Sequence, residues 1–229
     1  MKPVKVGLLG LGTVGTGVVR ILEGHQEDLS SQVGSPIVIE KIAVKTLDKA
    51  RSIHVEPHKL TEDPWSVIRD PEIDVIVEVM GGVDQTKAYI LEALERGKHI
   101  VTANKDLMAL YGSEILAKAM EHQCDVFYEA SVAGGIPIIR TLIEGFSSDR
   151  IMKIMGIVNG TTNYILSKMS QEGASYEDVL KEAQQLGYAE SDPTSDVEGL
   201  DAARKMAILA TLGFRTNVEL DDVHVRGIT

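Results

Sequence analysis

The chain has 229 residues, of which 44% are hydrophobic and 25% charged, a composition typical of a globular protein that can bury a sizeable core. Lys and Arg total 23 against 34 Asp and Glu, and the net charge of -11 argues against a general affinity for nucleic acid or anionic lipid. The single cysteine, Cys124, excludes an intrachain disulfide and indicates a reducing compartment.

The N-terminal residues lack the features of a secretion signal. The segment MKPVKVGLLGLG places a short apolar run directly before glycines and has no cleavage region. No later apolar run reaches the length of a transmembrane helix. These features predict a cytoplasmic protein that acts on a small molecule.

The first part of the chain alternates between strand-like and helix-like patterns. Apolar, β-branched runs predict strands over 4–9, 37–44, 73–79, 99–102 and 126–128, and two acids, Asp74 and Glu78, interrupt the third run. Apolar residues at helical spacing predict helices over 13–22, 85–96 and 107–120. The stretch 24–35, which is polar and holds two glycines and three serines, has the composition of a loop. This alternation predicts a doubly wound parallel sheet.

The pattern changes near Ser131. Pro137 begins a predicted helix that reaches Gly145, and the apolar run 151–158 predicts a long strand. Three more helices are predicted over 161–171, 176–186 and 198–212, the middle one preceded by a capping box of Ser175 and Asp178. The sequence therefore predicts an α/β domain over 1–130 and a mixed α+β domain over 131–229.

A glycine-rich stretch lies between the first predicted strand and the first predicted helix. Gly10-Leu11-Gly12-Thr13-Val14-Gly15 matches G-x-G-x-x-G. The first glycine permits a tight turn, the second lets the backbone approach a pyrophosphate, and the third lets the helix pack on the strand. The first helical residues, Thr13 and Val14, add amide donors at the positive end of the helix dipole. In this setting the pattern predicts a dinucleotide-binding site, and the alternative is a glycine turn that serves packing alone.

The end of the second predicted strand bears on the choice of dinucleotide. An acid there would bind the ribose 2'-hydroxyl of NAD, but the strand ends Ala43-Val44-Lys45-Thr46 and Glu40 lies too early for that role. Because a cation at this point can pair with a 2'-phosphate, we predict that NADP binds and leave open that NAD binds too. The alternative is that Lys45 is a solvated surface lysine.

Four longer motifs follow in order along the chain. They are VTANKD at 101–106, NGTTNYIL at 159–166, LGYAESDP at 186–193 and DVEGLDAARK at 196–205. The first ends a predicted strand at the carboxyl edge of the sheet, where ligands of α/β folds bind, and places Lys105 there. Together with the glycine loop, these motifs resemble homoserine dehydrogenase, whose sequences contain them in the same order. The resemblance spans the chain from the glycine loop to Lys205.

The resemblance implies a fold and a reaction. The fold is a Rossmann-type domain followed by a substrate-binding and dimerisation domain, with the active site in the cleft between them and a homodimer as the assembly. The reaction is the NAD(P)-dependent interconversion of L-aspartate 4-semialdehyde and L-homoserine, in threonine and methionine biosynthesis. Family members are longer than this chain, so we expect a truncated piece whose own activity is open.

The resemblance also implies roles for individual residues. Lys205 is the acid and base that moves the hydroxyl proton while hydride passes to or from the nicotinamide. Lys105 lies near cofactor and substrate, and Gly187 contributes to cofactor binding. The substrate ammonium requires carboxylates, which Glu190, Asp196 and Asp201 can supply, and the resemblance makes Glu190 and Asp201 the substrate contacts. For Glu190 alone, the alternative is a loop acid in solvent.

The last motif indicates a site by its own spacing. Asp201 and Lys205 are four residues apart and therefore share one face of a helix whose other positions are mostly apolar. A helix of this composition is buried, and buried charges are usually paired or functional. The alternative is an exposed ion pair.

The junction between the two predicted domains carries Glu129-Ala130-Ser131-Val132-Ala133-Gly134-Gly135-Ile136. The resemblance implies that this loop holds a monovalent cation, usually sodium, through the carboxylate of Glu129 and the backbone carbonyls of Val132, Gly134 and Ile136. Hard oxygen ligands suit such an ion. The alternative is a glycine hinge without a ligand.

Two other functions are compatible with parts of the sequence. A Gfo/Idh/MocA-type sugar dehydrogenase would share the glycine loop and a lysine at a strand end, but would lack Asp201 with Lys205. A nucleotide-binding module without catalysis would bind NADPH and turn nothing over. Assays of homoserine against sugars, and of binding against turnover, separate these readings.

Overall fold

The computed structural model describes residues 2–229. The chain divides into two compact units, unit 1 (Met1–Ser131) and unit 2 (Val132–Thr229). Within the described residues, every helix falls short of the length and apolar character that crossing a membrane requires.

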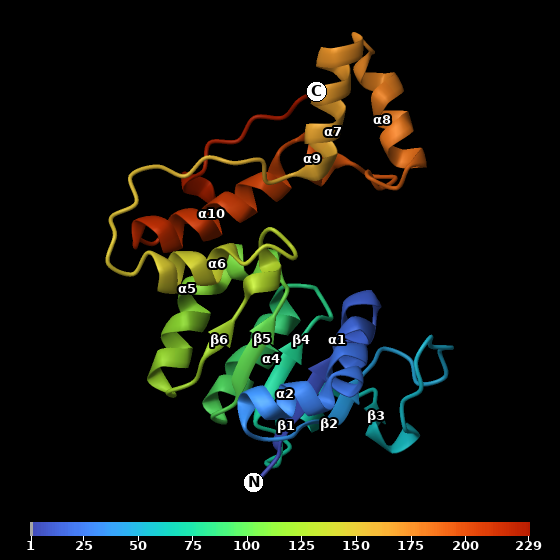
Figure 1. The fold of residues 1–229 in the computed structure, drawn as a ribbon, viewed down its shortest axis with the longest axis vertical. Helices are drawn as coiled ribbons and strands as arrows, with labels where there is room; N and C mark the ends of the chain where they lie inside the picture. Colours follow the sequence, from blue (N-terminus) through green and yellow to red (C-terminus); the bar gives the residue numbers. More distant parts are fainter. Residues whose placement is uncertain (1) are drawn as a thin grey trace. The chain divides into compact units, whose positions relative to one another are not determined.

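Unit 1 is built on a six-stranded parallel sheet (Figure 1). Its strands, in chain order, are β1 (Val4–Leu9), β2 (Ile37–Ala43), β3 (Leu60–Thr61), β4 (Val75–Glu78), β5 (His99–Thr102) and β6 (Val126–Phe127). Their order in space is β3-β2-β1-β4-β5-β6, and every neighbouring pair is parallel. This arrangement confirms the predicted doubly wound fold. The strand order reverses between β1 and β4, and doubly wound sheets bind ligands at the carboxyl ends of the strands at such a point.

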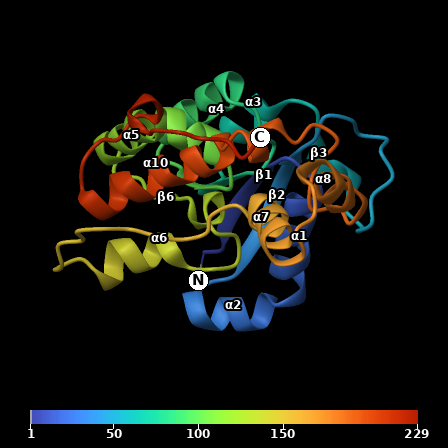
Figure 2. The same cartoon turned by 90° about the horizontal axis from the view of Figure 1, so that it is seen from above.

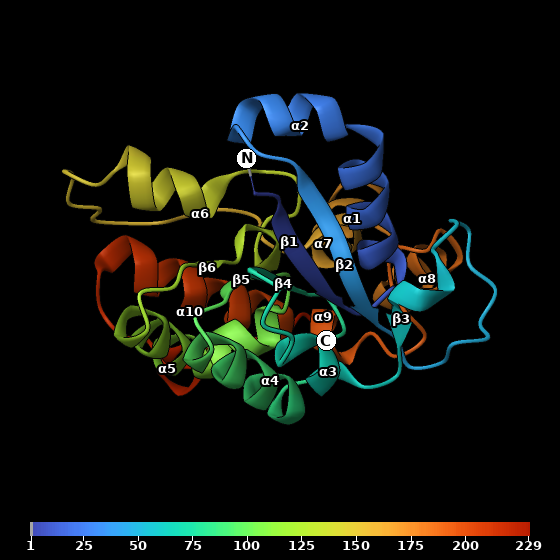
Figure 3. The ribbon, with the colours of Figure 1, turned by 90° about the horizontal axis from the view of Figure 1, so that it is seen from below.

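The helices of unit 1 cover both faces of this sheet. They are α1 (Thr13–Gly24), α2 (Gln26–Val33), α3 (Pro64–Ile68), α4 (Asp84–Glu95) and α5 (Lys105–Glu121). Figures 2 and 3 show α1 and α2 on one face and α3, α4 and α5 on the other. Coverage on both faces explains why the strands are continuous apolar runs rather than alternating ones. The core between β1, β2, β4 and α1 includes Val6, Leu8, Val19, Ile42 and Val77.

One predicted loop of unit 1 is a helix. The polar stretch 24–35 contains α2, whose first turn carries Glu27 and Asp28 and whose end is Gly34 in the left-handed conformation. Acids at a helix start interact favourably with the dipole, and a left-handed glycine terminates a helix well. The loop prediction was wrong because a short helix needs only a narrow contact with the sheet, and its polar composition resembles that of a loop.

Unit 2 consists of helices joined by irregular segments. They are α6 (Ile138–Arg140), continued by a π-helical stretch (Thr141–Gly145), then α7 (Gly160–Glu172), α8 (Tyr176–Gln185), α9 (Thr194–Val197) and α10 (Leu200–Phe214). Helices α7 and α8 form a hairpin (Figure 1). The Ser175 hydroxyl accepts a hydrogen bond from the Asp178 amide and caps α8, which is one half of the predicted capping box, while the Asp178 carboxylate accepts from the Ser175 hydroxyl. The core of this hairpin includes Ile165, Val179, Ala183, Ala189 and Val197.

The strand predicted over 151–158 is not formed. These residues lie between the π-helical stretch and α7 and belong to no helix or strand. Met152, Met155 and Ile157 are 78%, 77% and 76% exposed. A β-strand requires a neighbouring strand for its backbone hydrogen bonds, and the other described elements of unit 2 are helices and short turns. The apolar composition is that of a strand, but the pairing partner is not within this unit.

Candidate active site

The glycine-rich turn joins β1 to α1 at the carboxyl edge of the sheet. The Gly10 amide donates to the carbonyl of Ala43 at 2.9 Å, which ties the turn to the end of β2. Gly10 has a φ of +105°, a conformation that L side chains rarely adopt. Gly12 is the N-cap of α1, so the amides of Thr13 and Val14 lie at the start of that helix.

The three glycines of the turn are close to different neighbours. A Cβ on Gly10 would lie 2.8 Å from the Val79 carbonyl oxygen, and one on Gly15 only 2.2 Å from the Gly10 carbonyl oxygen. A Cβ on Gly12 would meet nothing within 4 Å. The turn is therefore closely packed against backbone at Gly10 and Gly15. It is open at Gly12, beside the amides at the start of α1. An open backbone at a helix N-terminus fits the pyrophosphate of a dinucleotide.

Two lysines of unit 1 follow, shortly after in the chain, strands that end at this edge of the sheet. Lys45 follows the end of β2 by two residues and is exposed. Lys105 is half-buried and is the first residue of α5, directly after the N-cap Asn104, whose side chain accepts the Leu107 amide at 3.1 Å. Both lysines thus follow carboxyl ends of parallel strands, β2 and β5, and the edge to which they belong also carries the glycine turn.

Glu78 is a buried acid at this edge that the sequence did not single out as a site residue. It ends β4, is 0% exposed, and accepts hydrogen bonds from the Met80 and Gly81 amides and from the Thr102 hydroxyl. Burial raises the pKa of this carboxyl above its usual range, while the hydrogen bonds act in the opposite direction. The available signal was an acid inside the otherwise apolar run 73–79, which we read only as an interruption.

The raised pKa of Glu78 predicts how its contribution to stability depends on pH. The folded state holds this proton more tightly than the unfolded chain, so the favourable contribution is fully present below the unfolded pKa and declines as pH rises through the folded pKa. Glu78→Gln cannot titrate. We therefore expect the free energy of unfolding of wild type, relative to Glu78→Gln, to fall as pH rises above the ordinary pKa of a glutamate carboxyl, about 4.3. Urea unfolding at several pH values measures this difference, and a pH-independent or rising difference would contradict the prediction.

Unit 2 brings four residues of two motifs into one hydrogen-bonded cluster. Lys205 Nζ on α10 donates to Asp201 Oδ2 at 2.6 Å and to the Val158 carbonyl at 2.7 Å. Asn159 Nδ2 donates to the same Asp201 oxygen at 3.0 Å and to Asp196 Oδ1 at 2.7 Å. Asp201 is buried, and the Lys205 side chain is 19% exposed. The ion pair is therefore part of a buried polar cluster and is not the exposed pair that was the alternative.

Asn159 was not among the residues that the sequence singled out. Its side chain oxygen accepts the Thr162 amide at 2.8 Å, so it caps α7 while its amide nitrogen holds the two carboxylates. An asparagine two residues before the predicted helix at 161–171 is a recognisable N-cap signal. The cap could therefore have been predicted, but not its contact with acids 37 and 42 residues further along the chain.

Two other predicted site residues lie outside this cluster. Glu190 is exposed, and its main-chain carbonyl accepts the side-chain amide of Gln184 at 3.1 Å. Gly187 follows α8 with a φ of +78° and donates its amide to the Gln184 carbonyl. The structure thus brings Asp196 and Asp201 together with Lys205, and leaves Glu190 and Gly187 in the loop between α8 and α9.

The predicted cation ligands are distributed over both units. Glu129 begins a 3-10 turn at the end of unit 1, and Val132, Gly134 and Ile136 open unit 2. Within unit 2, Ala133 and Gly135 have φ values of +51° and +81°, and the Ile136 amide donates to the Ala133 carbonyl. Within residues 2–229, His, Cys, Asp and Glu side chains form no group of three or more suited to a metal ion. A cation at this loop would therefore depend on main-chain carbonyls.

Both parts of the chain match models of one protein family. The model described as "Homoserine dehydrogenase, NAD binding domain" matches residues 10–129, and the model described as "Homoserine dehydrogenase" matches residues 137–229. The first match includes the glycine turn, Glu78 and Lys105. The second includes the cluster around Lys205.

Individual relatives agree with the family models. The chain is 64% identical to a homoserine dehydrogenase of Bacillus subtilis over all of its own length and 53% of the relative's, and 51% identical to one of Synechocystis over 98% and 52%. A solved homoserine dehydrogenase of Thiobacillus denitrificans superposes with a TM-score of 0.94 at 48% identity, covering all of this chain and 53% of the other. One from S. aureus gives 0.88 at 45%, covering all of this chain and 57% of the other. The chain thus spans about half the length of the curated relatives it matches.

Proposed function

The chain belongs to the homoserine dehydrogenase family, and from this premise we propose that it carries the cofactor-binding and substrate-binding parts of an enzyme that interconverts L-homoserine and L-aspartate 4-semialdehyde. The observation that carries this proposal is the buried cluster of Asn159, Asp201 and Lys205. The family match favours it over a sugar dehydrogenase, which would share the glycine turn and a strand-end lysine but not Asp201 with Lys205. The reaction would belong to threonine and methionine biosynthesis.

Lys205 is the proposed acid and base. Oxidation of an alcohol requires a base for the hydroxyl proton, and reduction of the aldehyde requires the same group as an acid. The 2.6 Å hydrogen bond to Asp201 orients Nζ, and Asn159 in turn fixes the Asp201 carboxylate. We propose that Asp196, Asp201 and Glu190 bind the substrate ammonium, because carboxylates are its natural partners. We further propose that Lys105 lies near the substrate and the cofactor and that Gly187 contributes to cofactor binding.

A nicotinamide dinucleotide is the cofactor of this proposal, and when bound it supplies or accepts the hydride. The residues present fit it: Gly10 and Gly15 are confined by backbone, whereas a Cβ on Gly12 would meet only open space beside the amides of α1. Gly12, Thr13 and Val14 would hold the pyrophosphate through their main chain. A homoserine-dependent increase in NADPH absorbance in a solution of the chain and NADP tests the whole proposal. Binding of NADPH without any turnover would support a nucleotide-binding module instead.

Lys45 is the proposed determinant of NADP binding. It is exposed directly after β2, where an anion on the adenosine ribose would lie in a doubly wound fold. We expect Lys45→Ala to weaken NADPH binding about 10-fold, because one charge-assisted contact to the 2'-phosphate is lost, and to leave NADH binding unchanged. Fluorescence titration with both reduced cofactors measures the ratio. Lys49→Ala, at another exposed lysine of the same loop, is the control, and equal loss for both cofactors would contradict this role.

Two further parts of the proposal concern a cation and the assembly. Glu129 and the carbonyls of Val132, Gly134 and Ile136 offer four hard oxygen ligands, including one carboxylate, which suits a monovalent cation such as sodium. A homodimer is supported by the unpaired, exposed apolar segment 151–158, because a second strand would satisfy its backbone and cover its side chains.

A further inference from the structure

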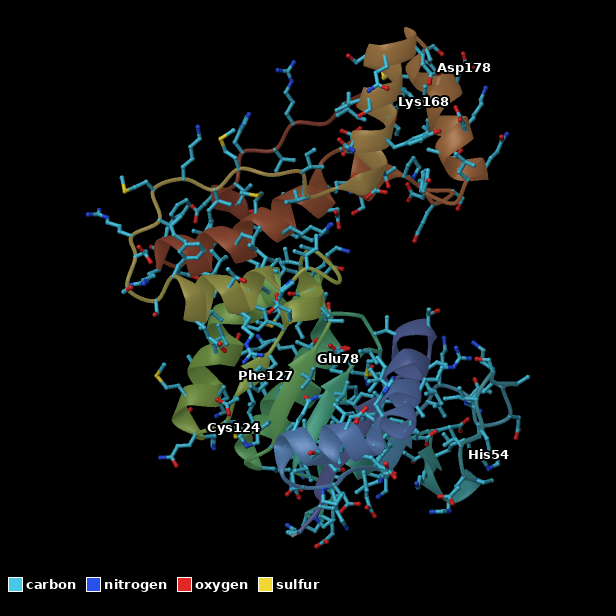
Figure 4. The ribbon with its side chains drawn as sticks, in the orientation of Figure 1. His54, Glu78, Cys124, Phe127, Lys168 and Asp178 are labelled. Atoms are coloured by element: carbon cyan, nitrogen blue, oxygen red, sulfur yellow. The ribbon has the colours of Figure 1, made fainter. Side chains whose placement is uncertain are left out.

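Burial distinguishes one charged residue of unit 1 from the others. Three charged side chains are buried among residues 2–229, namely Glu78, Lys98 and Asp201, and Glu78 is the least exposed, at 0%. In Figure 4 it is labelled at the parallel sheet, whose β4 it ends. Burying a carboxylate costs free energy unless hydrogen-bond donors surround it, so its partners indicate what the side chain does.

The groups that form hydrogen bonds to the carboxylate are donors. Glu78 Oε1 accepts the amides of Met80 at 2.9 Å and Gly81 at 3.1 Å, and Oε2 accepts the Thr102 hydroxyl at 2.6 Å. An ionised carboxylate has only acceptors and matches this set, whereas an alkyl side chain would leave two amides and a hydroxyl without their partner. The side chain therefore ties the segment after β4 to the end of β5.

The carbonyls of the same segment are held as well. The Thr86 hydroxyl donates to the Gly81 carbonyl at 2.7 Å, and Asn104 Nδ2 donates to the Gly82 carbonyl at 2.7 Å. The main-chain amide of Asn104 donates to Thr102 Oγ1 at 3.0 Å. Through Thr102 it connects Asn104 to Glu78. Because Asn104 also caps α5, the network fixes the helix start at which Lys105 lies.

The segment held by Glu78 lies against the glycine turn. Glu78 is paired with Leu9, the residue before Gly10, and the Val79 amide donates to the Leu9 carbonyl at 2.9 Å. A Cβ on Gly10 would lie 2.9 Å from both the Met80 nitrogen and the Met80 Cα. The Met80 backbone is thus one wall of the turn that we propose binds the dinucleotide.

We propose that Glu78 is a positioning residue for dinucleotide binding, one that fixes the Met80–Gly82 backbone against the glycine turn and sets the start of α5. The inference rests on the proposed cofactor site. In these contacts Glu78 binds the main chain of Met80 and Gly81 and the Thr102 hydroxyl, so it acts on the proposed cofactor site through the loop. An apolar side chain would fill the same space without the cost of desolvating a charge, so the contribution of the carboxylate is to order the donors around it.

The test compares three variants of the 229-residue chain by titration with NADPH and NADH. We expect Glu78→Ala to lower the affinity for both cofactors about 10-fold, because a loop that is no longer held by the carboxylate must be ordered on binding. Glu78→Gln keeps an oxygen for both amides but sets an amide nitrogen against the Thr102 hydroxyl, so we expect a loss of about 3-fold. Lys98→Met is the matched control. It removes a buried charge at the opposite edge of the sheet, where Lys98 donates to the Asp70 and Ile73 carbonyls, and we expect unchanged affinity.

Hydrogen exchange without cofactor provides a second readout. The Met80 and Gly81 amides should exchange faster in Glu78→Ala and remain protected in Lys98→Met. If Glu78→Ala does not fold, Glu78→Gln decides by the same two measurements. Wild-type affinity in both folded Glu78 variants would overturn the inference and leave the cofactor site intact. A wild-type chain that binds neither NADH nor NADPH would overturn the proposed function and this inference with it.

Discussion

Replacing Lys205 by methionine is expected to lower the rate of homoserine-dependent NADP reduction by about 10²- to 10⁴-fold, the usual contribution of a general acid or base. Methionine keeps the apolar stem of the side chain and removes the amine that donates to Asp201 and the Val158 carbonyl. The loss should affect kcat, because proton transfer belongs to the chemical step. Absorbance of the reduced nicotinamide measures it.

Controls separate this effect from unfolding. The substitution removes the partner of the buried Asp201 carboxylate. Breaking a buried ion pair in this way lowers the free energy of unfolding by about 3 kcal/mol. NADPH affinity should nevertheless stay at the wild-type value, since the glycine turn belongs to unit 1. Lys168, labelled on α7 in Figure 4, also pairs with an acid, Glu182 at 2.7 Å, and Lys168→Met should retain full activity. Full activity in Lys205→Met would show that another group moves the proton.

Gly15→Ala is expected to lower the stability of unit 1 strongly. The new Cβ would lie 2.2 Å from the Gly10 carbonyl oxygen, so α1 would have to move away from the turn. Overpacking of this kind costs about 3 kcal/mol, because the obstacle is backbone and cannot change rotamer. The free energy of unfolding from urea titration measures the cost.

Two neighbouring glycines test the same turn differently. Gly12 and Gly17 both have open space where a Cβ would be added, so alanine at either should change stability by less than about 1 kcal/mol. Gly12→Ala should still weaken NADPH binding at least about 10-fold, because the added methyl group occupies the space that the pyrophosphate needs. Gly17→Ala should leave the affinity unchanged. Equal affinities in both variants would contradict a dinucleotide at this turn.

Local chemistry explains why much of unit 1 could be predicted from the sequence. The strands at 4–9 and 99–102 are observed with the predicted bounds, because short runs rich in apolar and β-branched residues favour a strand by their local composition. The cap at Ser175 was predicted because it depends on residues three positions apart. The stretch that forms α2 was misread because a short polar helix and a loop share the same composition.

The sequence by itself determined five of the six strands of unit 1 and its helices α1, α4 and α5, the strand-turn-helix setting of the glycine loop and the pairing of Asp201 with Lys205 on one helix face. These features depend on residues within a few positions of each other. Only the tertiary structure decided that Glu78 ties the loop after β4 to Thr102, that Asn159 binds Asp201, and that the segment 151–158 has no strand partner within unit 2. Each of these outcomes depends on groups far apart in the chain, and spacing along the sequence does not specify which distant donor a buried acceptor meets.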